Sequence, residues 1–132
     1  MLYKKVSLRL SMYEYISLDG IPLRVGKNAK DNTTIPREPK EWWVHVADSP
    51  GSHVIIGCES DHISKDTKTD AAVLAIHHSK APSKKKTVVH LVRAEQVIPH
   101  KHTGQVVLEG TVIHLTIFMN KENSRLDRLL KK

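Results

Sequence analysis

The fold is decided by the stretch EWWVHVADSPGSHVIIGC, residues 41–58. Two runs within it, 41–48 and 53–58, are rich in Val, Ile and Trp, and such β-branched and aromatic residues favour strands. Between them stands Ser-Pro-Gly-Ser, in which the Pro-Gly pair suits a tight turn. The stretch therefore predicts a β-hairpin, with Trp43 and His45 on one face of its first strand because side chains alternate along a strand.

The strongest helix signal follows this hairpin, at residues 67–79. Its middle is rich in alanine, and the apolar run 73–76 indicates that much of the helix is buried against a sheet. Thr67 and Asp70 have the spacing of an N-terminal capping box. Pro82 prevents the helix from continuing.

Alternating or β-branched runs predict strands elsewhere. These runs are 2–10, 13–17, 21–25, 87–92, 96–98, 106–109 and 111–119. Asp19-Gly20 predicts a tight turn between the second and third of them, and Pro22 indicates that the third lies at a sheet edge. The last two runs are expected to pair around Gly110. Leucines in the charged segment 120–132 have the spacing of a short helix.

These elements predict an α+β fold, with a mostly antiparallel sheet of about eight short strands, one main central helix and room for a short second helix. The length fits one domain, 1–119, followed by the charged C-terminal tail 120–132. The lone cysteine, Cys58, excludes an internal disulfide and a CxxC zinc motif. No apolar run reaches the length of a membrane span, and the first residues lack the apolar core of a secretory signal. The expected location is the cytoplasm, with the nucleus as the alternative.

The net charge of +7 is unevenly distributed. Residues 80–105 hold six basic groups and one acid, whereas residues 49–79 hold two basic groups and four acids. Such a basic patch favours a polyanion as partner, because counterion release supplies binding free energy. A solvated surface that keeps the protein soluble is the alternative. Lys84, Lys85 and Lys86, in the loop after the predicted helix, are the densest part of this patch and candidate phosphate contacts.

A glycine-containing segment that follows a predicted strand is a candidate phosphate cradle. Gly26 lets the backbone turn sharply and approach a ligand closely, and Lys27 and Lys30 add two positive charges beside it. If the following residues begin a helix, their free amides point at the same ligand, where Asn28 and Asn32 supply further polar groups. The segment matches neither the Walker P-loop nor the dinucleotide fingerprint, and an ordinary polar connection is the alternative.

The hairpin supplies the second group of candidate residues. If Trp43 and His45 lie on a solvent-exposed face, they can stack unpaired bases, whereas the alternative is a core tryptophan beside a hydrogen-bonded histidine. Gly51, Ser52 and His53 lie where a turn can grip a phosphate. His45, Asp48, Ser52 and His53 are also the only dense group of catalytic residue types, and the enzyme alternative rests on His45, Ser52 and His53. No nucleophile elbow or acid pair surrounds them, so no enzyme activity is expected.

Nine histidines raise the question of a metal site. Zinc ligands need a workable spacing, such as His-x-x-x-His on a helix, whereas the side chains of the adjacent His77 and His78 diverge. No metal and no other cofactor are therefore expected. Protonation of histidines below about pH 6.5 would strengthen the binding of anions.

Several short segments carry a resemblance to a known family. They are SLDG at 17–20, VGKNAKDN at 25–32, WVHV at 43–46, PGSHVI at 50–55, AAVLA at 71–75, HSK at 78–80 and GTV at 110–112. In this order and spacing they resemble the NFACT-R domain, over roughly residues 12–119. The resemblance implies an RNA-binding module, found in ribosome-associated quality-control factors that act on stalled large subunits and tRNA, and in small proteins with a coiled-coil tail. It also implies a shared surface formed by Gly26, Lys27, Asn28, Lys30, Asn32, His45, Pro50, Gly51, Ser52 and His53.

Departures from the family pattern limit what the resemblance implies. The sequence carries neither the large N-terminal domain nor the helical arms of the quality-control factors, so their tailing and rescue activities are not expected of it. Val44 stands where an aromatic residue is common, and His78 stands where tyrosine is common.

The function expected from the sequence is the binding of structured RNA, either tRNA or ribosomal RNA, with DNA as a further partner. One alternative is a general protein that coats or compacts DNA and RNA. A histidine-dependent enzyme acting on nucleic acid is the other alternative. The oligomeric state is not indicated by the sequence.

Overall fold

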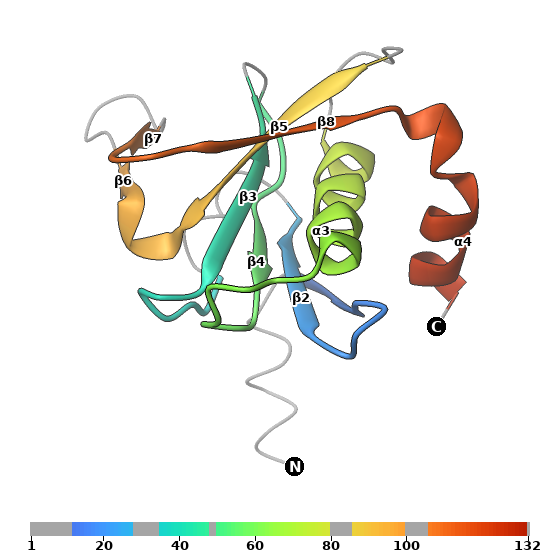
Figure 1. Ribbon diagram of the computed structural model, residues 1–132, viewed down its shortest axis with the longest axis horizontal. Coiled ribbons are helices and arrows are strands. Elements are labelled where there is room, and N and C mark those ends of the chain that lie inside the picture. Colours follow the sequence, from blue (N-terminus) through green and yellow to red (C-terminus); the bar gives the residue numbers. More distant parts are fainter. Residues whose placement is uncertain (1–11, 28–34, 48–49, 80–85, 100–105, 132) are drawn as a thin grey trace.

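The computed structural model describes residues 12–27, 35–47, 50–79, 86–99 and 106–131. Its strands are β1 (Met12–Ile16), β2 (Pro22–Gly26), β3 (Trp42–Val46), β4 (Val54–Ile56), β5 (Thr87–Arg93), β6 (Val97–Pro99), β7 (Val106–Leu108) and β8 (Ile113–Ile117). Its helices are α3 (Lys65–His78) and α4 (Asn123–Lys131), with short 3-10 turns η1 (Ala94–Gln96) and η2 (Met119–Lys121). Figure 1 shows α3 lying against the main sheet and α4 near the C-terminal end of the chain. Within these ranges, no helix is long and apolar enough to cross a bilayer.

The main sheet has the strand order β1-β2-β4-β3-β5-β8 and is antiparallel throughout, which confirms the predicted fold class. β3 and β4 form the predicted hairpin, in which Trp43 lies opposite Ile55. β2 lies between β1 and β4, so the edge position inferred from Pro22 is wrong. Pro22 is the first residue of its strand, a position that tolerates proline, and its carbonyl accepts a hydrogen bond from Gly57 N at 2.8 Å. The strand predicted at 2–10 lies outside the described residues.

Two glycines adopt the left-handed backbone conformation that their turns require. Gly20, with φ 82°, closes the predicted turn between β1 and β2. Gly110, with φ 79°, does not join β7 to β8 as a hairpin. β7 pairs with β6 and β8 pairs with β5, so the predicted final strand pair is wrong. The side-chain amide of Gln96 donates to the carbonyls of Glu109 (2.6 Å) and Thr111 (2.9 Å) and holds this bend against η1.

α3 begins at Lys65, two residues before its predicted start, because Ser64 is the N-cap. The Ser64 hydroxyl accepts a hydrogen bond from Thr67 N at 3.1 Å. The predicted capping box is therefore wrong, since Thr67 and Asp70 lie inside the helix and are fully buried. The predicted burial of the helix is confirmed, because residues 70–75 are all buried.

The main sheet buries apolar side chains on both of its faces. The larger core cluster joins one face to α3. It includes Leu23, Val25, Val44, Val54, Leu74 and Leu91. The smaller cluster, on the other face, consists of Ile35, Trp43, Ile55 and Val92, and apolar side chains of β6 and β7 pack against it.

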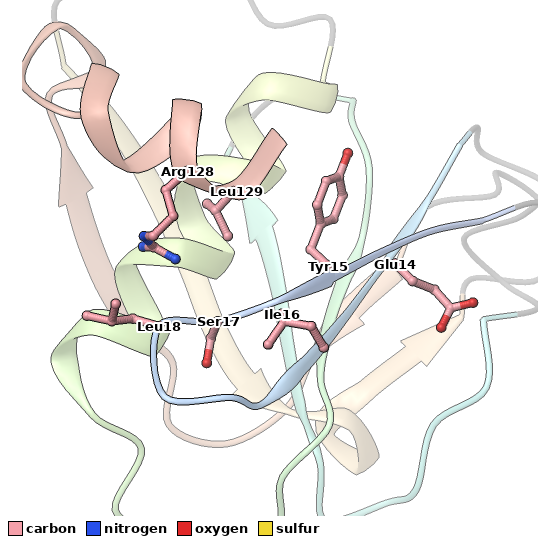
Figure 2. A pocket seen from close by; sticks show the side chains of 7 residues that line it. All are labelled: Glu14, Tyr15, Ile16, Ser17, Leu18, Arg128 and Leu129. Atoms are coloured by element: carbon pink, nitrogen blue, oxygen red, sulfur yellow. The ribbon is translucent and has the colours of Figure 1, made fainter. Parts of the chain in front are cut away.

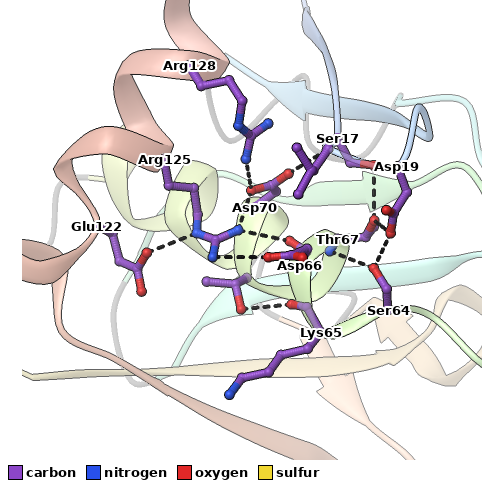
Figure 3. A network of polar contacts seen from close by, with 12 residues as sticks. Ser17, Asp19, Ser64, Lys65, Asp66, Thr67, Asp70, Glu122, Arg125 and Arg128 are labelled. Atoms are coloured by element: carbon purple, nitrogen blue, oxygen red, sulfur yellow. Dashed lines mark hydrogen bonds and ion pairs between the residues drawn. The ribbon is translucent and has the colours of Figure 1, made fainter.

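The C-terminal tail contains the predicted second helix, α4, which contacts α3 and β1. Leu129 is only 4% exposed and belongs to the larger core cluster. Figure 3 shows Arg125 and Arg128 reaching from α4 to Asp70 of α3, with nitrogen–oxygen distances of 2.8 and 2.6 Å. Leu18 N donates to the same carboxylate at 2.8 Å. This carboxylate therefore ties the turn after β1 to both helices.

Candidate nucleic-acid interface

The end of β2 and the start of β4 bring together the two segments that the sequence singles out. Gly26, the last residue of β2, donates its amide hydrogen to the carbonyl of His53 at 3.1 Å. Lys27 follows directly and is exposed. The glycine–lysine segment and the β3–β4 turn are thus neighbours in space, as a shared phosphate site requires. Three further predicted residues lie outside the described ranges: Asn28, Lys30 and Asn32.

The β3–β4 turn is held against the C-terminal end of α3. Ser52 is 3% exposed, and its Oγ donates to the carbonyl of His78 at 3.1 Å. Gly51 lies so close to Ser79 that a Cβ added at Gly51 would be 2.5 Å from Ser79 Cβ. Gly51 and Ser52 therefore fix the position of the turn relative to the helix.

The rings of Trp43, His45 and His53 pack together at the β3–β4 turn. Trp43 and His45 stack, with centroids 5.4 Å apart and 14° between the ring planes. His53 meets both rings edge-on, at 4.9 and 5.0 Å. Trp43 is only 1% exposed and belongs to the smaller core cluster, so the alternative of a core tryptophan is confirmed and the alternative of a solvent-exposed stacking face at Trp43 is wrong. The physical reason is that β6 and β7 supply apolar cover to this face of the sheet, a tertiary arrangement that the alternation along β3 does not reveal.

The two histidines of this group reach solvent only in part. His53 is 9% exposed, and His45 is half-buried. Burial lowers the pKa of His45, against the opposing effect of backbone hydrogen bonds with Gly51 and Val46. The His45 imidazole is therefore neutral at pH 7, and it interacts with partners as a polar ring and not as a cation.

A second aromatic group, which the sequence analysis did not single out, lies beside Lys27. Tyr13 of β1 stacks on His78, with centroids 4.5 Å apart and 20° between the planes, and Lys27 Nζ lies 5.0 Å from the centre of the Tyr13 ring. The Tyr15 hydroxyl and His78 Nε2 are 2.8 Å apart. Burial, and then the charge of His77, lowers the pKa of His78 to about 4, so this ring is also neutral at pH 7.

The cations at this end of the molecule are not paired with acids in the part of the chain that the structure describes. Lys27 and Lys86 are exposed, and neither takes part in an ion pair of the described residues. Figure 1 shows the β3–β4 turn, the C-terminal end of α3 and the start of β5, which Lys86 precedes, at the same end of the molecule. Acids are paired elsewhere: Glu41 with Arg24, Glu95 with Lys40, and Asp61 with Arg93. The predicted contacts Lys84 and Lys85 lie outside the described residues.

A pocket of about 380 Å³ lies elsewhere, between β1 and α4 (Figure 2). Its lining residues are Glu14, Tyr15, Ile16, Ser17, Leu18, Arg128 and Leu129. This pocket contains none of the predicted binding residues. Across the described ranges, no group of three or more His, Cys, Asp or Glu side chains is arranged to hold a metal ion.

The profile of a known family, described as the NFACT protein RNA binding domain, matches residues 11–115. The chain belongs to the NFACT-R family. The family assignment made from the sequence is thus confirmed, and the chain's class as an RNA-binding domain follows from it.

The NFACT-R domain of this chain is similar to parts of longer proteins. It is 38% identical over 105 residues to the Rqc2 homolog RqcH of Streptococcus suis, a match that covers 76% of this chain and 18% of the relative. The match to RqcH of Bacillus subtilis has 34% identity over 86 residues and covers 63% of this chain and 15% of the relative. The chain therefore covers less than a fifth of the length of these curated relatives.

A solved structure shares the NFACT-R fold described above. It is the C-terminal part of the fibronectin/fibrinogen-binding protein from Streptococcus suis, with a TM-score of 0.70 and 31% sequence identity. The superposition covers 86% of this chain and 48% of that chain.

The predicted site residues of this NFACT-R domain differ in what they can contact. Lys27 and Lys86 are exposed and can contact a ligand. Gly26, Ser52 and His53 are buried, and their contacts fix the position of the backbone at the surface. Contact of each of these residues with RNA stays a prediction. Sequence reasoning missed the Tyr13–His78 stack, although one signal was available: alternation along β1 places Tyr13 and Tyr15 on the same side of the sheet.

Proposed function

We propose that this NFACT-R domain binds structured RNA, either tRNA or ribosomal RNA, at the end of the molecule where β2, the β3–β4 turn and α3 meet. Lys27 and Lys86 contact phosphates there, together with Lys30, Lys84 and Lys85 from the predicted basic segments. Asn28, Asn32 and His45 supply polar contacts. The occurrence of the family in ribosome-associated quality-control factors makes these two RNA classes the ones to test, and both predict a cytoplasmic protein.

One observation supports this proposal above all others: the hydrogen bond from Gly26 N to the carbonyl of His53 (3.1 Å). It joins the glycine–lysine segment to the hairpin, so Lys27 projects beside a turn that Ser52 fixes to α3. Such a surface suits a phosphate chain, because exposed lysines that lack acidic partners release counterions when RNA binds.

We also propose that the domain binds RNA without processing it. Ser52 is the only nucleophile type in the predicted catalytic group, and its hydroxyl donates to the backbone carbonyl of His78. A serine nucleophile needs its proton directed at a general base. In this arrangement Ser52 is a structural clamp, and His45 and His53 support the turn through ring contacts.

The test is a salt titration of RNA affinity with a charge-neutralising variant. Binding of fluorescently labelled tRNA is measured by anisotropy at several salt concentrations for the wild type and for Lys27→Gln/Lys86→Gln. Each phosphate contact adds roughly 0.7–0.9 to the slope of log affinity against log salt, so the double variant should lose about 1.4–1.8 units of slope. Its affinity at low salt should fall about tenfold or more.

The matched control is Lys65→Gln/Lys68→Gln, which removes the same charge from the opposite, N-terminal end of α3. Equal affinities of this control and the Lys27/Lys86 variant would mean that the interface lies elsewhere. A ribosomal RNA fragment and a duplex DNA of the same length are titrated in parallel. Equal affinity for DNA and RNA would replace the proposal with the alternative of a general nucleic-acid-coating protein.

A further inference from the structure

The stack of Tyr13 on His78 lies at the surface, and Tyr13 is not part of the hydrophobic core. Tyr15, two residues along β1, packs against the larger core cluster, whereas Tyr13 belongs to neither cluster and is 40% exposed. The Tyr13 ring is therefore accessible to a partner at the surface.

Several independent contacts hold His78, the inner residue of the stack, in place. His78 is the last residue of α3, and its backbone carbonyl accepts the hydroxyl of Ser52 from the β3–β4 turn. Its side chain lies within hydrogen-bond distance of the Tyr15 hydroxyl, 2.8 Å from oxygen to Nε2. The ring of His77 meets it edge-on at 4.8 Å. His78 therefore forms a rigid support on which Tyr13 lies.

A cation lies over the face of the exposed ring of this stack. Lys27 Nζ is 5.0 Å from the Tyr13 centroid, and Lys27 is exposed and outside the ion pairs of the described residues. A cation–π contact at an exposed site is weak, so the flexible lysine can leave the ring and pair with another group at little cost. Once Lys27 has moved off the ring face, an aromatic surface and a neighbouring cation match both parts of a nucleotide, the base and the phosphate.

We propose that Tyr13, supported by His78, is the stacking platform for one unpaired RNA base, with Lys27 pairing with the phosphate next to that base. This inference rests on the proposed function, because the platform adjoins the same interface. Stacking on a π-face is tolerant of base identity, so the platform should hold a base from a loop or a single-stranded end without reading its sequence.

The test compares two oligoribonucleotides of the same length. One is a short single-stranded RNA, and the other is abasic at every position, so that it keeps the phosphates but offers no base to stack. Because stacking of a base on an aromatic side chain is worth a measurable part of single-strand affinity, Tyr13→Ala should weaken binding of the intact oligonucleotide about tenfold. Tyr13→Phe keeps the ring and should bind like the wild type.

Three features of the design separate this inference from the proposed function. The salt slope of Tyr13→Ala should equal that of the wild type, because no charge is removed. The abasic oligonucleotide should bind the wild type and Tyr13→Ala equally. Ile16→Ala removes a side chain that is 60% exposed from the same strand, and it should leave the affinity for both oligonucleotides unchanged.

A second readout locates the contact directly. Oligonucleotides that carry 5-bromouridine crosslink to aromatic rings under ultraviolet light, and mass spectrometry should find the crosslink at Tyr13 or His78. Equal affinity of Tyr13→Ala and the wild type for the intact oligonucleotide would overturn the platform. If Lys27→Gln/Lys86→Gln still lost affinity in that case, the proposed interface would stand without it. Failure of the wild type to bind any RNA would overturn both.

Discussion

At the scale of single residues, His78 carries the clearest dependence on pH. Its pKa falls from 6.5 to about 4, first because the ring is buried and then because His77 adds positive charge nearby. A histidine with a lowered pKa is harder to protonate in the folded chain than in the unfolded chain. Its contribution to stability is therefore fully present above pH 6.5 and is lost as the pH falls toward 4.

This shift gives a prediction for the stability of the protein between pH 7 and pH 4. The free energy of unfolding, from urea titrations, should fall by about 1 kcal/mol more in the wild type than in His78→Tyr, since each pKa unit is worth about 1.4 kcal/mol and solvent screens part of this effect at the partly buried ring. Tyrosine keeps an aromatic ring at this position without a group that titrates in that range. His45 and the carboxylates are common to both proteins and cancel in the difference. A constant difference across the pH range would contradict the lowered pKa.

At the scale of secondary-structure elements, the contact of the β3–β4 turn with α3 sets the shape of the interface. Gly51→Ala places a Cβ only 2.5 Å from Ser79 Cβ, which is closer than two carbon atoms can pack, so the turn and the helix must separate. We expect the free energy of unfolding to fall by about 1–3 kcal/mol in thermal or urea unfolding, the usual cost of overpacking.

A compensating variant distinguishes this clash from a loss of glycine flexibility. Ser79→Gly removes the opposing Cβ, and the remaining Ser79 Cα lies 3.4 Å from the added atom. The double variant Gly51→Ala/Ser79→Gly should therefore be more stable than Gly51→Ala alone. If the double variant is instead less stable by the sum of both single effects, the two residues do not clash and the proposed contact is wrong.

The same scale shows which parts of the fold could be predicted from the sequence. The β3–β4 hairpin and the body of α3 follow from local composition, because their strands and helix are stabilised by neighbouring residues in the chain. The start of α3 was misplaced because Ser64 and Thr67 are both acceptable N-caps, and only the buried position of Thr67 decides between them. The pairing of β7 with β6 is accompanied by the hydrogen bond from the Gln96 side chain to the carbonyl of Glu109, a contact that no local pattern encodes.

For the candidate site too, the local segments could be predicted from the sequence, but the contacts between them could not. The segment at Gly26 and the turn at His53 could be selected one by one, but their hydrogen bond depends on β2 pairing with β4, a choice among several strands. The stack of Tyr13 on His78 joins residues from β1 and α3 that are far apart in the sequence. A sequence pattern indicates which residues share one face of a strand or helix. It does not indicate which two elements pack together, and the stack depends on that packing.

At the scale of the whole molecule, charged groups with different roles lie on different parts of the surface. Lys27 follows β2 and Lys86 precedes β5, and both are exposed, whereas Arg125 and Arg128 of α4 are paired with the buried carboxylate of Asp70 (Figure 3). Although burial alone would lower the pKa of Arg125, the hydrogen bonds and charges of Asp70 and Glu122 raise it above its usual value. These arginines are thus part of the fold and not of the cationic interface.

Stability and RNA affinity should therefore respond to separate substitutions. Asp70→Asn leaves two arginines without their buried partner and should lower the free energy of unfolding by about 3 kcal/mol, while RNA affinity, measured by anisotropy where the variant is fully folded, stays at the wild-type value. Asp66→Asn is the matched control, because Asp66 meets the same Arg125 at 3.3 Å but its side chain is 51% exposed. An exposed pair of this kind is worth less than about 1 kcal/mol. A loss of RNA affinity in folded Asp70→Asn would show that the docking of α4 is coupled to the interface, and the separation of the two surfaces would then be wrong.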